Sequence, residues 1–373
     1  MTVAIVRAIG RALDKQDLSR AEMAEVVGQI MDGQATAAQI GGFLIALRAK
    51  GEAVEELVGA AAAMRSRATP LTCPHPEHAI DTCGTGGDGA GTINVSTLAA
   101  ILIAACGGTV AKHGNRALSS KCGSADVLEA LGVTADVEPA IVERCMAMAG
   151  IGFAFAPRFH AATRHVGGPR RELGTRTIFN LLGPLTNPAN VKHQVIGVYD
   201  RRWCEHMAAA LGALGLRRAA VVHGAGGIDE IAVRGETHVA LWEASEGSVQ
   251  ALSFTPRTFG VDELDPAGLA GGDAAHNAGV LRRVLAGHEV GRGERYEAAL
   301  RAAAMTAALG LELLEPGELD LARLPDQYLR AAATVKNGTA RLVLHKWREL
   351  SQATEGDWAA LRALEPSAFV GVE

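Results

Sequence analysis

Five glycines fall within residues 81–97, which read DTCGTGGDGAGTINVST, and this density constrains the fold more than any other feature. Because glycine has no Cβ atom, the backbone can adopt positive φ angles and bring its N–H groups close to an anion. The segment follows a strand-like run and leads through Asn94, Ser96 and Thr97 into the apolar helix-like run LAAILIAA. Hydroxyl and free N–H groups at a helix N-terminus favour a phosphate. The segment therefore predicts a loop that binds a phosphorylated ligand.

A second segment with similar chemistry follows at 110–131, which reads VAKHGNRALSSKCGSADVLEAL. Its lysine, histidine, arginine and serine side chains lie between a short strand-like run and another apolar helix-like run. A single glycine cluster is often only a tight turn, and neither segment contains the GlyLysSer or GlyLysThr of a Walker loop. Two such segments in succession favour a phosphate site over two unrelated turns.

The composition excludes two classes of partner. The chain of 373 residues has a net charge of −5 and a pI near 6.2, with basic residues only in short pairs such as Arg170-Arg171, so no nucleic-acid partner is expected. No stretch approaches the ~18 uninterrupted apolar residues of a membrane span, and the N-terminus lacks a signal-peptide pattern. Six cysteines form no CxxC pair. We therefore expect a cytoplasmic protein with reduced thiols and no membrane partner.

Helical periodicity dominates residues 1–72, where Ser19 with Glu22 and Thr36 with Gln39 have capping-box spacing. Beyond a proline-rich linker, strand-like and helix-like runs alternate, which predicts an α/β fold with a mainly parallel sheet covered by helices. Strands are expected at 78–82, 108–112, 151–156, 194–199, 219–223, 238–243 and 248–254, and later helices at about 275–287, 292–312 and 325–351.

Six motifs follow one another in order along most of the chain. They are GTGGD at 84–88, NVST at 94–97, KHGN at 112–115, GSADVLEALG at 123–132, ELGTRTIFNLLGPLTNP at 172–188, and VHG with GIDE between 222 and 230. Through these motifs the chain resembles the anthranilate phosphoribosyltransferases. The resemblance implies transfer of the phosphoribosyl group of 5-phosphoribosyl 1-pyrophosphate to the amine of anthranilate, a step of tryptophan biosynthesis.

The resemblance also implies a set of site residues. Ser96, Asp229 and Glu230 are the candidate Mg²⁺ ligands, and adjacent carboxylates at the exit of a parallel strand suit a hard ion that bridges to phosphates. The candidate catalytic residues are Lys112, Asp88 and Arg170, with Arg170 holding the anthranilate carboxylate. The candidate substrate-binding residues are Gly84, Gly87, Asp88, Thr92, Asn94, Val95, Ser96, Thr97, Lys112, His113, Gly114, Asn115, Arg116, Ser119, Ser120, Ser124 and Arg170.

The resemblance further implies a small helical domain beside a larger α/β domain, and a homodimer that forms through the helical domain. The helical domain is expected to comprise residues 1–72 together with about 167–190. The α/β domain, which binds phosphoribosyl pyrophosphate, is expected to comprise 73–166 and 191–351. Residues 352–373 form a C-terminal tail beyond the family pattern.

The chain departs from the family pattern around the acceptor. The segment His160-Ala161-Ala162-Thr163 stands in place of HisProAlaMet, and Gly168-Pro169 stands in place of a Pro-Val before Arg170. These differences leave transfer to another aromatic amine as an alternative. A pyrimidine nucleoside phosphorylase-like enzyme and a non-catalytic, nucleic-acid-binding relative are further alternatives. The missing lysine-histidine-serine glycine loop opposes the first, and the acidic pI opposes the second.

Overall fold

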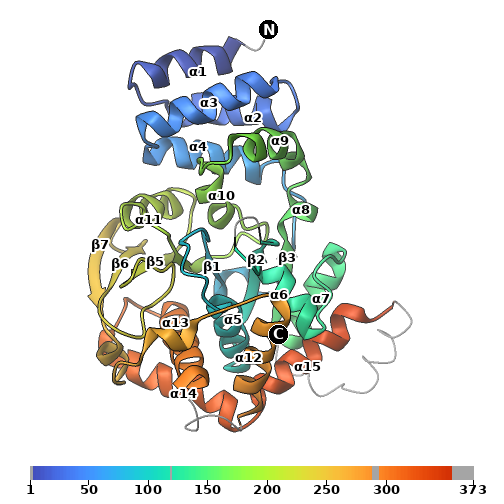
Figure 1. The fold of residues 1–373 in the computed structure, drawn as a ribbon, viewed down its shortest axis with the longest axis vertical. Coiled ribbons are helices and arrows are strands. Elements are labelled where there is room, and N and C mark those ends of the chain that lie inside the picture. The colour runs from blue at the N-terminus through green and yellow to red at the C-terminus, as the bar shows by residue number, and fades with distance from the viewer. Residues whose placement is uncertain (1–2, 118–119, 288–293, 355–373) are drawn as a thin grey trace.

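The computed structural model describes residues 3–117, 120–287 and 294–354, and shows a helical domain above a larger α/β domain (Figure 1). Both predicted capping boxes form, because the side chain of Ser19 accepts from the Glu22 N–H and that of Thr36 accepts from the Gln39 N–H. A later helix, α9, packs against α2 and α3. The helices of this part are α1 (Val3–Leu13), α2 (Arg20–Met31), α3 (Ala37–Lys50), α4 (Val54–Arg65) and α9 (Arg164–Leu173).

The seven predicted strands form one sheet in the order β3-β2-β1-β4-β5-β6-β7. The first five in this order pair in parallel, and β6 and β7 continue the sheet in antiparallel fashion. The prediction of a mainly parallel sheet is therefore confirmed. The strands are β1 (Ala79–Gly84), β2 (Thr109–Gly114), β3 (Ile151–Phe155), β4 (His193–Gly197), β5 (Arg218–Gly224), β6 (Thr237–Glu243) and β7 (Ser248–Phe254).

Helices cover both faces of the sheet (Figure 1). On one face α11 packs on β5 and β6, and on the other α5 and α13 pack on β1. The remaining helices connect strands or close the ends of the sheet. The helices of this domain are α5 (Val95–Ala105), α6 (Ser124–Leu131), α7 (Pro139–Ala149), α8 (Ala156–Phe159), α11 (Trp203–Ala213), α12 (Ala274–Ala286), α13 (Glu294–Leu314), α14 (Leu324–Lys336) and α15 (Thr339–Gln352). Helix α10 (Phe179–Leu185) contacts both α4 of the helical domain and α11.

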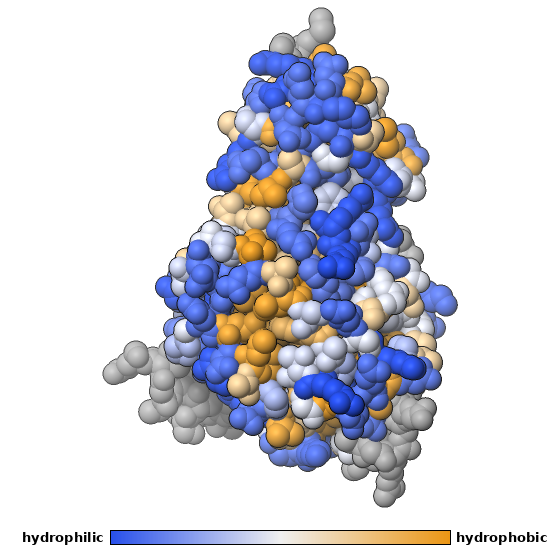
Figure 2. Space-filling view, turned by 90° about the vertical axis from the view of Figure 1, so that its left-hand side faces the viewer, coloured by the Kyte–Doolittle hydropathy of each residue, from blue (hydrophilic) through white to orange (hydrophobic). Residues whose placement is uncertain are grey.

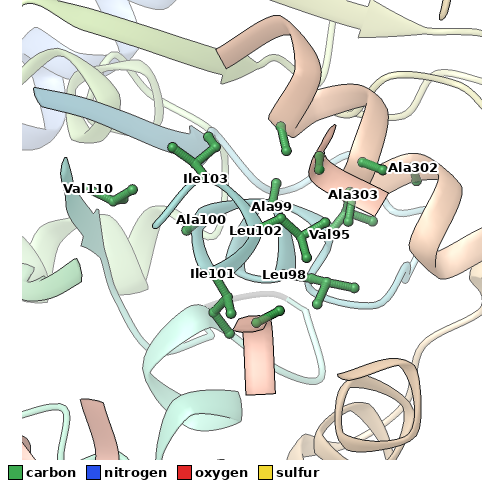
Figure 3. Close-up of a cluster of buried hydrophobic side chains, with 14 of the residues drawn as sticks. Val95, Leu98, Ala99, Ala100, Ile101, Leu102, Ile103, Val110, Ala302 and Ala303 are labelled. Carbon is green, nitrogen blue, oxygen red and sulfur yellow. The ribbon is translucent and has the colours of Figure 1, made fainter. Parts of the chain in front are cut away.

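Helix α5 anchors the core because it is apolar on all sides, as expected of a helix with no solvent face. Leu98, Ile101 and Leu102 are fully buried, and Figure 3 shows α5 beside Ala302 and Ala303 of α13. The small alanine side chains let the two helices approach closely. Each fully buried leucine or isoleucine contributes roughly 1.5–3 kcal/mol. The helix that follows the glycine loop is therefore firmly fixed, and with it the N-terminus that faces the loop.

The structure differs from prediction in the last helical segment. We expected one helix over 325–351, but α14 ends at Lys336 and α15 begins at Thr339. Gly338 lies between them with a φ of 83°, a conformation that stops a helix and that glycine adopts without strain. Within the described residues, no helix is long and apolar enough to cross a membrane. Most of the predicted tail, 355–373, lies outside the described residues.

Candidate active site

Four neighbouring parallel strands end in glycine at one edge of the sheet, at Gly84, Gly114, Gly197 and Gly224. A Cβ atom at Gly197 would stand 1.5 Å from the main-chain oxygen of Asp229, and one at Gly224 would stand 2.4 Å from that of Glu230. Only glycine permits such close approach. The segment that carries the two acids is therefore folded onto the carboxyl ends of the strands, where ligand sites of open α/β sheets lie.

The three candidate metal ligands lie together at this edge. Asp229 and Glu230 are each only 9% exposed. The Gly86 N–H donates to Asp229 Oδ2 at 2.8 Å, and the Ser96 N–H donates to Glu230 Oε1 at 3.2 Å. The N–H of Asp229 in turn donates to Asp88 Oδ2 at 3.3 Å. These contacts join the glycine loop, the first turn of α5 and the Asp-Glu pair.

The acids at this site repel one another. Burial and the nearby Asp88 carboxylate raise the pKa of Asp229 to about 7, and burial together with Asp229 raises the pKa of Glu230 well above its usual range. A bound cation relieves such repulsion. Two carboxylates and a hydroxyl are hard oxygen donors. This donor set fits Mg²⁺, which binds through one or two carboxylates and completes its shell with waters and substrate phosphates.

Lys112 lies next to the candidate metal ligands Ser96 and Glu230, and it is only 1% exposed. Its Nζ donates to the main-chain oxygen of Thr82 at 2.5 Å and to Ser96 Oγ at 3.4 Å. Burial lowers the pKa of Lys112, while the carboxylates of Asp81 and Glu230 act in the opposite direction. In this conformation the ammonium group is thus a buried counter-charge to the acids.

The glycine loop is held by a residue that the sequence did not single out. Gly86 and Gly87 have φ angles of 64° and 78°, as an anion-binding loop requires. The carbonyl of Gly87 accepts from Arg176 Nη2, and the same guanidinium lies over the ring of Tyr199, 4.1 Å from its centroid. Arg176 belongs to the segment between α9 and α10, and the only sequence signal was its place in the ELGTRT motif.

Asn94 occupies the N-cap position of α5, and its side chain is oriented by a second residue that the sequence did not single out, Asn277 of α12. Asn94 Oδ1 accepts from Asn277 Nδ2 at 2.9 Å. Thr97 Oγ1 is buried and has no hydrogen-bond partner in the described part of the chain. The side chain of Val95 is buried (Figure 3), and its N–H donates to the carbonyl of Ile93 at 2.8 Å. Thr92 forms a β-bridge with Ala270.

His113 of the KHGN motif lies near the end of β2 and contacts the ring of His160. The His113 N–H donates to Asp81 Oδ1 at 3.1 Å, and its Nδ1 lies 3.1 Å from the carbonyl of Gly183. The rings of His113 and His160 meet edge to face with centroids 5.1 Å apart. Neither Nε2 has a partner among the described residues. The sequence singled out His160 only as the first residue of the segment that departs from the family pattern. The structure brings it next to His113, a candidate site residue.

The polar groups of the segment that follows β2 already make contacts within the protein. Arg116 forms ion pairs with Glu129 at 2.6 Å and Asp126 at 3.2 Å. Ser124 Oγ donates to the carbonyl of Asn115 at 3.3 Å. A Cβ atom at Gly114 would stand 2.2 Å from Ser124 Oγ, which explains the glycine there. Ser120 is exposed, and Ser119 lies outside the described residues.

Arg170 lies on α9, on the segment that links the two domains. Its guanidinium lies 5.6 Å from the centroid of the Phe179 ring, and burial lowers its pKa. No carboxylate within the described residues forms an ion pair with it. A half-buried guanidinium in this state retains the bidentate donors that suit a ligand carboxylate.

The chain matches the glycosyl transferase family over most of its length. Residues 6–68 match its helical bundle domain, and residues 76–341 match its a/b domain. An anthranilate phosphoribosyltransferase of Anaeromyxobacter dehalogenans is 49% identical over 350 residues, which cover 94% of this chain and 98% of the relative.

The chain belongs to the anthranilate phosphoribosyltransferases.

Solved structures agree with this assignment. Anthranilate phosphoribosyltransferase from Thermus thermophilus matches with a TM-score of 0.82 and 39% identity, over 93% of this chain and 99% of its own. The enzyme from Saccharomyces cerevisiae, solved in complex with PRPP and Mg, matches with a TM-score of 0.83 and 26% identity, over 94% and 98%. A further anthranilate phosphoribosyltransferase, from Moorella thermoacetica, is 52% identical over 279 residues, which cover 75% of this chain and 81% of its own.

The burial of three histidines predicts how the stability of this protein depends on pH. Burial is the main reason that the pKa of His113 falls to about 3, and that those of His160 and His193 fall to about 4. The unfolded chain binds these protons near pH 6.5, so acid favours unfolding. Stability is therefore fully present above pH 6.5 and is lost as the pH falls towards 4, by about 1.4 kcal/mol per pH unit for each histidine.

Urea unfolding between pH 5 and pH 7 measures this slope. His193→Gln should reduce the slope of the unfolding free energy against pH by the contribution of one histidine. His206→Gln is the control, because His206 is exposed and should not contribute to the slope. An equal slope in the wild type and in His193→Gln would contradict the prediction.

Proposed function

We propose that this protein transfers the phosphoribosyl group of 5-phosphoribosyl 1-pyrophosphate to the amine of anthranilate, giving N-(5-phosphoribosyl)anthranilate and pyrophosphate. One observation supports this above the others. The glycine loop, the N-terminus of α5 and the pair Asp229-Glu230 are hydrogen-bonded to one another at the carboxyl ends of the parallel strands. This arrangement can receive an anion and a divalent cation at the same point.

The donor side acts by electrostatics. Ser96, Asp229 and Glu230 would hold Mg²⁺, which supplies positive charge that neutralises the pyrophosphate oxygens as they gain negative charge. The backbone N–H groups of the glycine loop and the Thr97 hydroxyl are donors for the same oxygens. Arg176 keeps the loop in shape through the Gly87 carbonyl. In the reaction the bond from the anomeric carbon to the pyrophosphate oxygen breaks, and the electron pair leaves with pyrophosphate.

The acceptor side acts by positioning. The anthranilate amine is already neutral at pH 7, forms the new C–N bond with the anomeric carbon, and then loses a proton to water. Arg170 is proposed to bind the anthranilate carboxylate and so to fix the amine within reach. His113 and His160 stay neutral because burial lowers the pKa of each, so they add no positive charge next to the developing ribosyl cation.

The test is an assay with phosphoribosyl pyrophosphate, Mg²⁺ and anthranilate, followed by loss of anthranilate fluorescence. We expect turnover that requires all three. Other aromatic amines are tested in parallel, because the chain departs from its family near the acceptor. Thr163 Oγ1 donates to the carbonyl of His160 at 2.7 Å, and open space surrounds Gly168. Faster turnover of another amine than of anthranilate would overturn the acceptor assignment.

Arg170→Ala separates the two substrates. Loss of a charge-assisted pair is worth roughly 1.5–3 kcal/mol, so we expect the KM for anthranilate to rise about tenfold or more while the KM for the donor changes little. Aniline is the control, because it lacks the carboxylate and its weak reaction should be almost indifferent to the substitution. Equal losses of activity with aniline and anthranilate would mean that Arg170 organises the site without binding the carboxylate of the acceptor.

We further propose a homodimer formed through the helical domain, which we take as 1–72 with about 167–190. Val6 and Leu13 on α1 and Ile45 on α3 are large apolar side chains that are 55%, 66% and 41% exposed, and α1 packs against α3. Exposed apolar side chains on neighbouring helices can form part of an interface between subunits. On the face in Figure 2 the helical domain is mainly hydrophilic, with hydrophobic residues at its margins. Light scattering on Leu13→Lys with Ile45→Lys is expected to give a monomer, and a wild-type monomer would contradict the proposal.

We place the protein in the cytoplasm. Its six cysteines are all free thiols, as a reducing compartment keeps them.

A further inference from the structure

A segment from late in the chain is fixed against the end of the glycine loop. Residues 269–272 run beside residues 91–93 and form two main-chain hydrogen bonds with them, of 3.0 Å and 2.8 Å. A Cβ atom at Gly271 would stand 2.5 Å from the main-chain oxygen of Thr92, which leaves no room for a larger residue. Helix α12 begins directly after this segment. The start of α12 is thereby brought to Asn94, the N-cap residue of α5.

Asn277, at the start of α12, has a side-chain orientation that the backbone decides. It is only 1% exposed, and its Oδ1 accepts from the Gly272 N–H at 2.8 Å. Because a backbone N–H can only donate, the oxygen of this amide faces Gly272 and its nitrogen faces the other way. That nitrogen donates to Asn94 Oδ1 at 2.9 Å. The side chain of Asn94 is thus fixed in turn, with its oxygen towards α12.

Asn94 does not make the contact that an asparagine at an N-cap usually makes. The side-chain oxygen of such a residue accepts from a backbone N–H in the first turn of its own helix. Within the described residues Asn94 makes no hydrogen bond of this kind. Its Oδ1 accepts instead from Asn277 and from the thiol of Cys122, the latter at 3.4 Å. The contact with Asn277 therefore holds the oxygen of Asn94 away from the N-terminus of α5.

The group that this arrangement leaves uncovered belongs to the donor site. An N-cap side chain reaches the N–H groups of the second and third helical residues, which in α5 are Ser96 and Thr97. The Ser96 N–H already donates to Glu230 Oε1. The Thr97 N–H is therefore the one that the oxygen of Asn94 would otherwise occupy. A phosphate at a helix N-terminus needs such N–H groups, and a capping oxygen competes with it for them.

We propose that Asn277 is a positioning residue for the phosphoribosyl pyrophosphate site, because it turns the oxygen of Asn94 away from α5 and keeps the first turn of that helix open to a phosphate. Asn277 does not itself touch the donor in this account and acts only through Asn94. The inference rests on the proposed function, in which Asn94 and the first turn of α5 bind the donor.

The test measures the KM for each substrate in full-length variants. Asn277→Leu has almost the same shape and no charge, and it frees the oxygen of Asn94 to cap α5. We expect the KM for phosphoribosyl pyrophosphate to rise about fivefold, in the middle of the range that an N-cap side chain contributes at a helix N-terminus, and the KM for anthranilate to change less than about twofold. Asn277→Asp still accepts from the Gly272 N–H, so it keeps that contact for the fold, but it cannot donate to Asn94. Its KM for the donor should rise at least as much.

Asn94→Ala separates orientation from packing, because it removes the side chain through which Asn277 acts. In that background Asn277→Leu should change the KM for the donor less than about twofold, since residues that act through one another are not additive. Asn337→Asp is the matched control for Asn277→Asp, because Asn337 is exposed at the end of α14, and it should change neither KM. A rise with Asn94→Ala present that equals the rise without it would overturn the proposal.

Donor binding gives a readout without turnover. Phosphoribosyl pyrophosphate with Mg²⁺ should raise the Tm of the wild type, and with fivefold weaker affinity Asn277→Leu should need about five times more donor for the same rise. Equal Tm responses and equal donor KM values in the wild type and the Asn277 variants would contradict the role of Asn277 alone. A wild type that neither binds nor consumes phosphoribosyl pyrophosphate would contradict the proposed function and, with it, this inference.

Discussion

Replacing Asp229 by asparagine and Glu230 by glutamine together is expected to lower turnover about a thousandfold, the scale of losing a metal ion that stabilises transition-state charge. The two side chains keep their shape but lose the charges that would hold Mg²⁺. The fold should survive. Because the buried acids repel each other and Asp88, the metal-free variant should be at least as stable as the wild type at pH 8.

Thermal unfolding provides a readout that does not depend on activity. A ligand that binds only the folded state raises the Tm with its concentration. Mg²⁺ should therefore raise the Tm of the wild type and leave that of the double variant unchanged. The control is Glu246→Gln, which removes one charge from an exposed turn between β6 and β7 and should keep both turnover and the Mg²⁺ response. Wild-type turnover in the folded double variant would contradict the assignment of Asp229 and Glu230 as Mg²⁺ ligands.

The sequence predicted the parts of the site whose signal is local. Each of the seven strands was expected within a few residues of its observed bounds, because apolar runs between turn residues mark buried strands. The glycine loop and the Asp-Glu pair were recognisable because each lies within one short segment. That they meet at one sheet edge follows from parallel topology, since the carboxyl ends of parallel strands lie together.

Residues that act through distant contacts could not be predicted. Arg176 contacts Gly87 across 89 positions of the chain, and Asn277 contacts Asn94 across 183. Neither belongs to a periodic or capping pattern, so only the fold reveals its partner. The break at Gly338 was missed for another reason. Helical periodicity continues on both sides of it, and a single glycine within such a pattern is often tolerated.

Burial was the second property that the sequence did not reveal. Val95 belongs to a motif with phosphate chemistry, yet at the first turn of α5 its side chain faces the core (Figure 3). Arg116 was a candidate phosphate ligand, and the structure pairs it with two acids of α6. Both roles remain predictions, and the contacts that these residues make count against them. Lys112 is the case in which burial changes the mechanism, and its substitution tests that directly.

Lys112→Ala and Lys112→Met are each expected to lower the rate on the order of a hundredfold, comparable to losing a preorganised charged donor. The structure gives a physical reason for this loss of rate. The ammonium group donates to Thr82 and Ser96 behind the metal candidates and is a counter-charge to Asp81 and Glu230. Without it the pKa of Glu230 should rise further, because an attractive charge is gone. More Mg²⁺ should then be needed for half-maximal rate.

Two comparisons separate this role from simple packing. Methionine fills the space of the lysine stem without its charge, so Lys112→Met should match Lys112→Ala in rate while keeping more stability, since alanine also leaves a cavity. A lysine that only bound the donor phosphates would raise the KM for phosphoribosyl pyrophosphate and leave the Mg²⁺ midpoint unchanged. If either variant changes the rate less than about threefold, Lys112 is a structural residue. A hundredfold loss of rate together with a raised Mg²⁺ midpoint would show that the charge of Lys112 supports Glu230 as a metal ligand. The hydrogen bonds to Thr82 and Ser96 hold the ammonium group within reach of that acid.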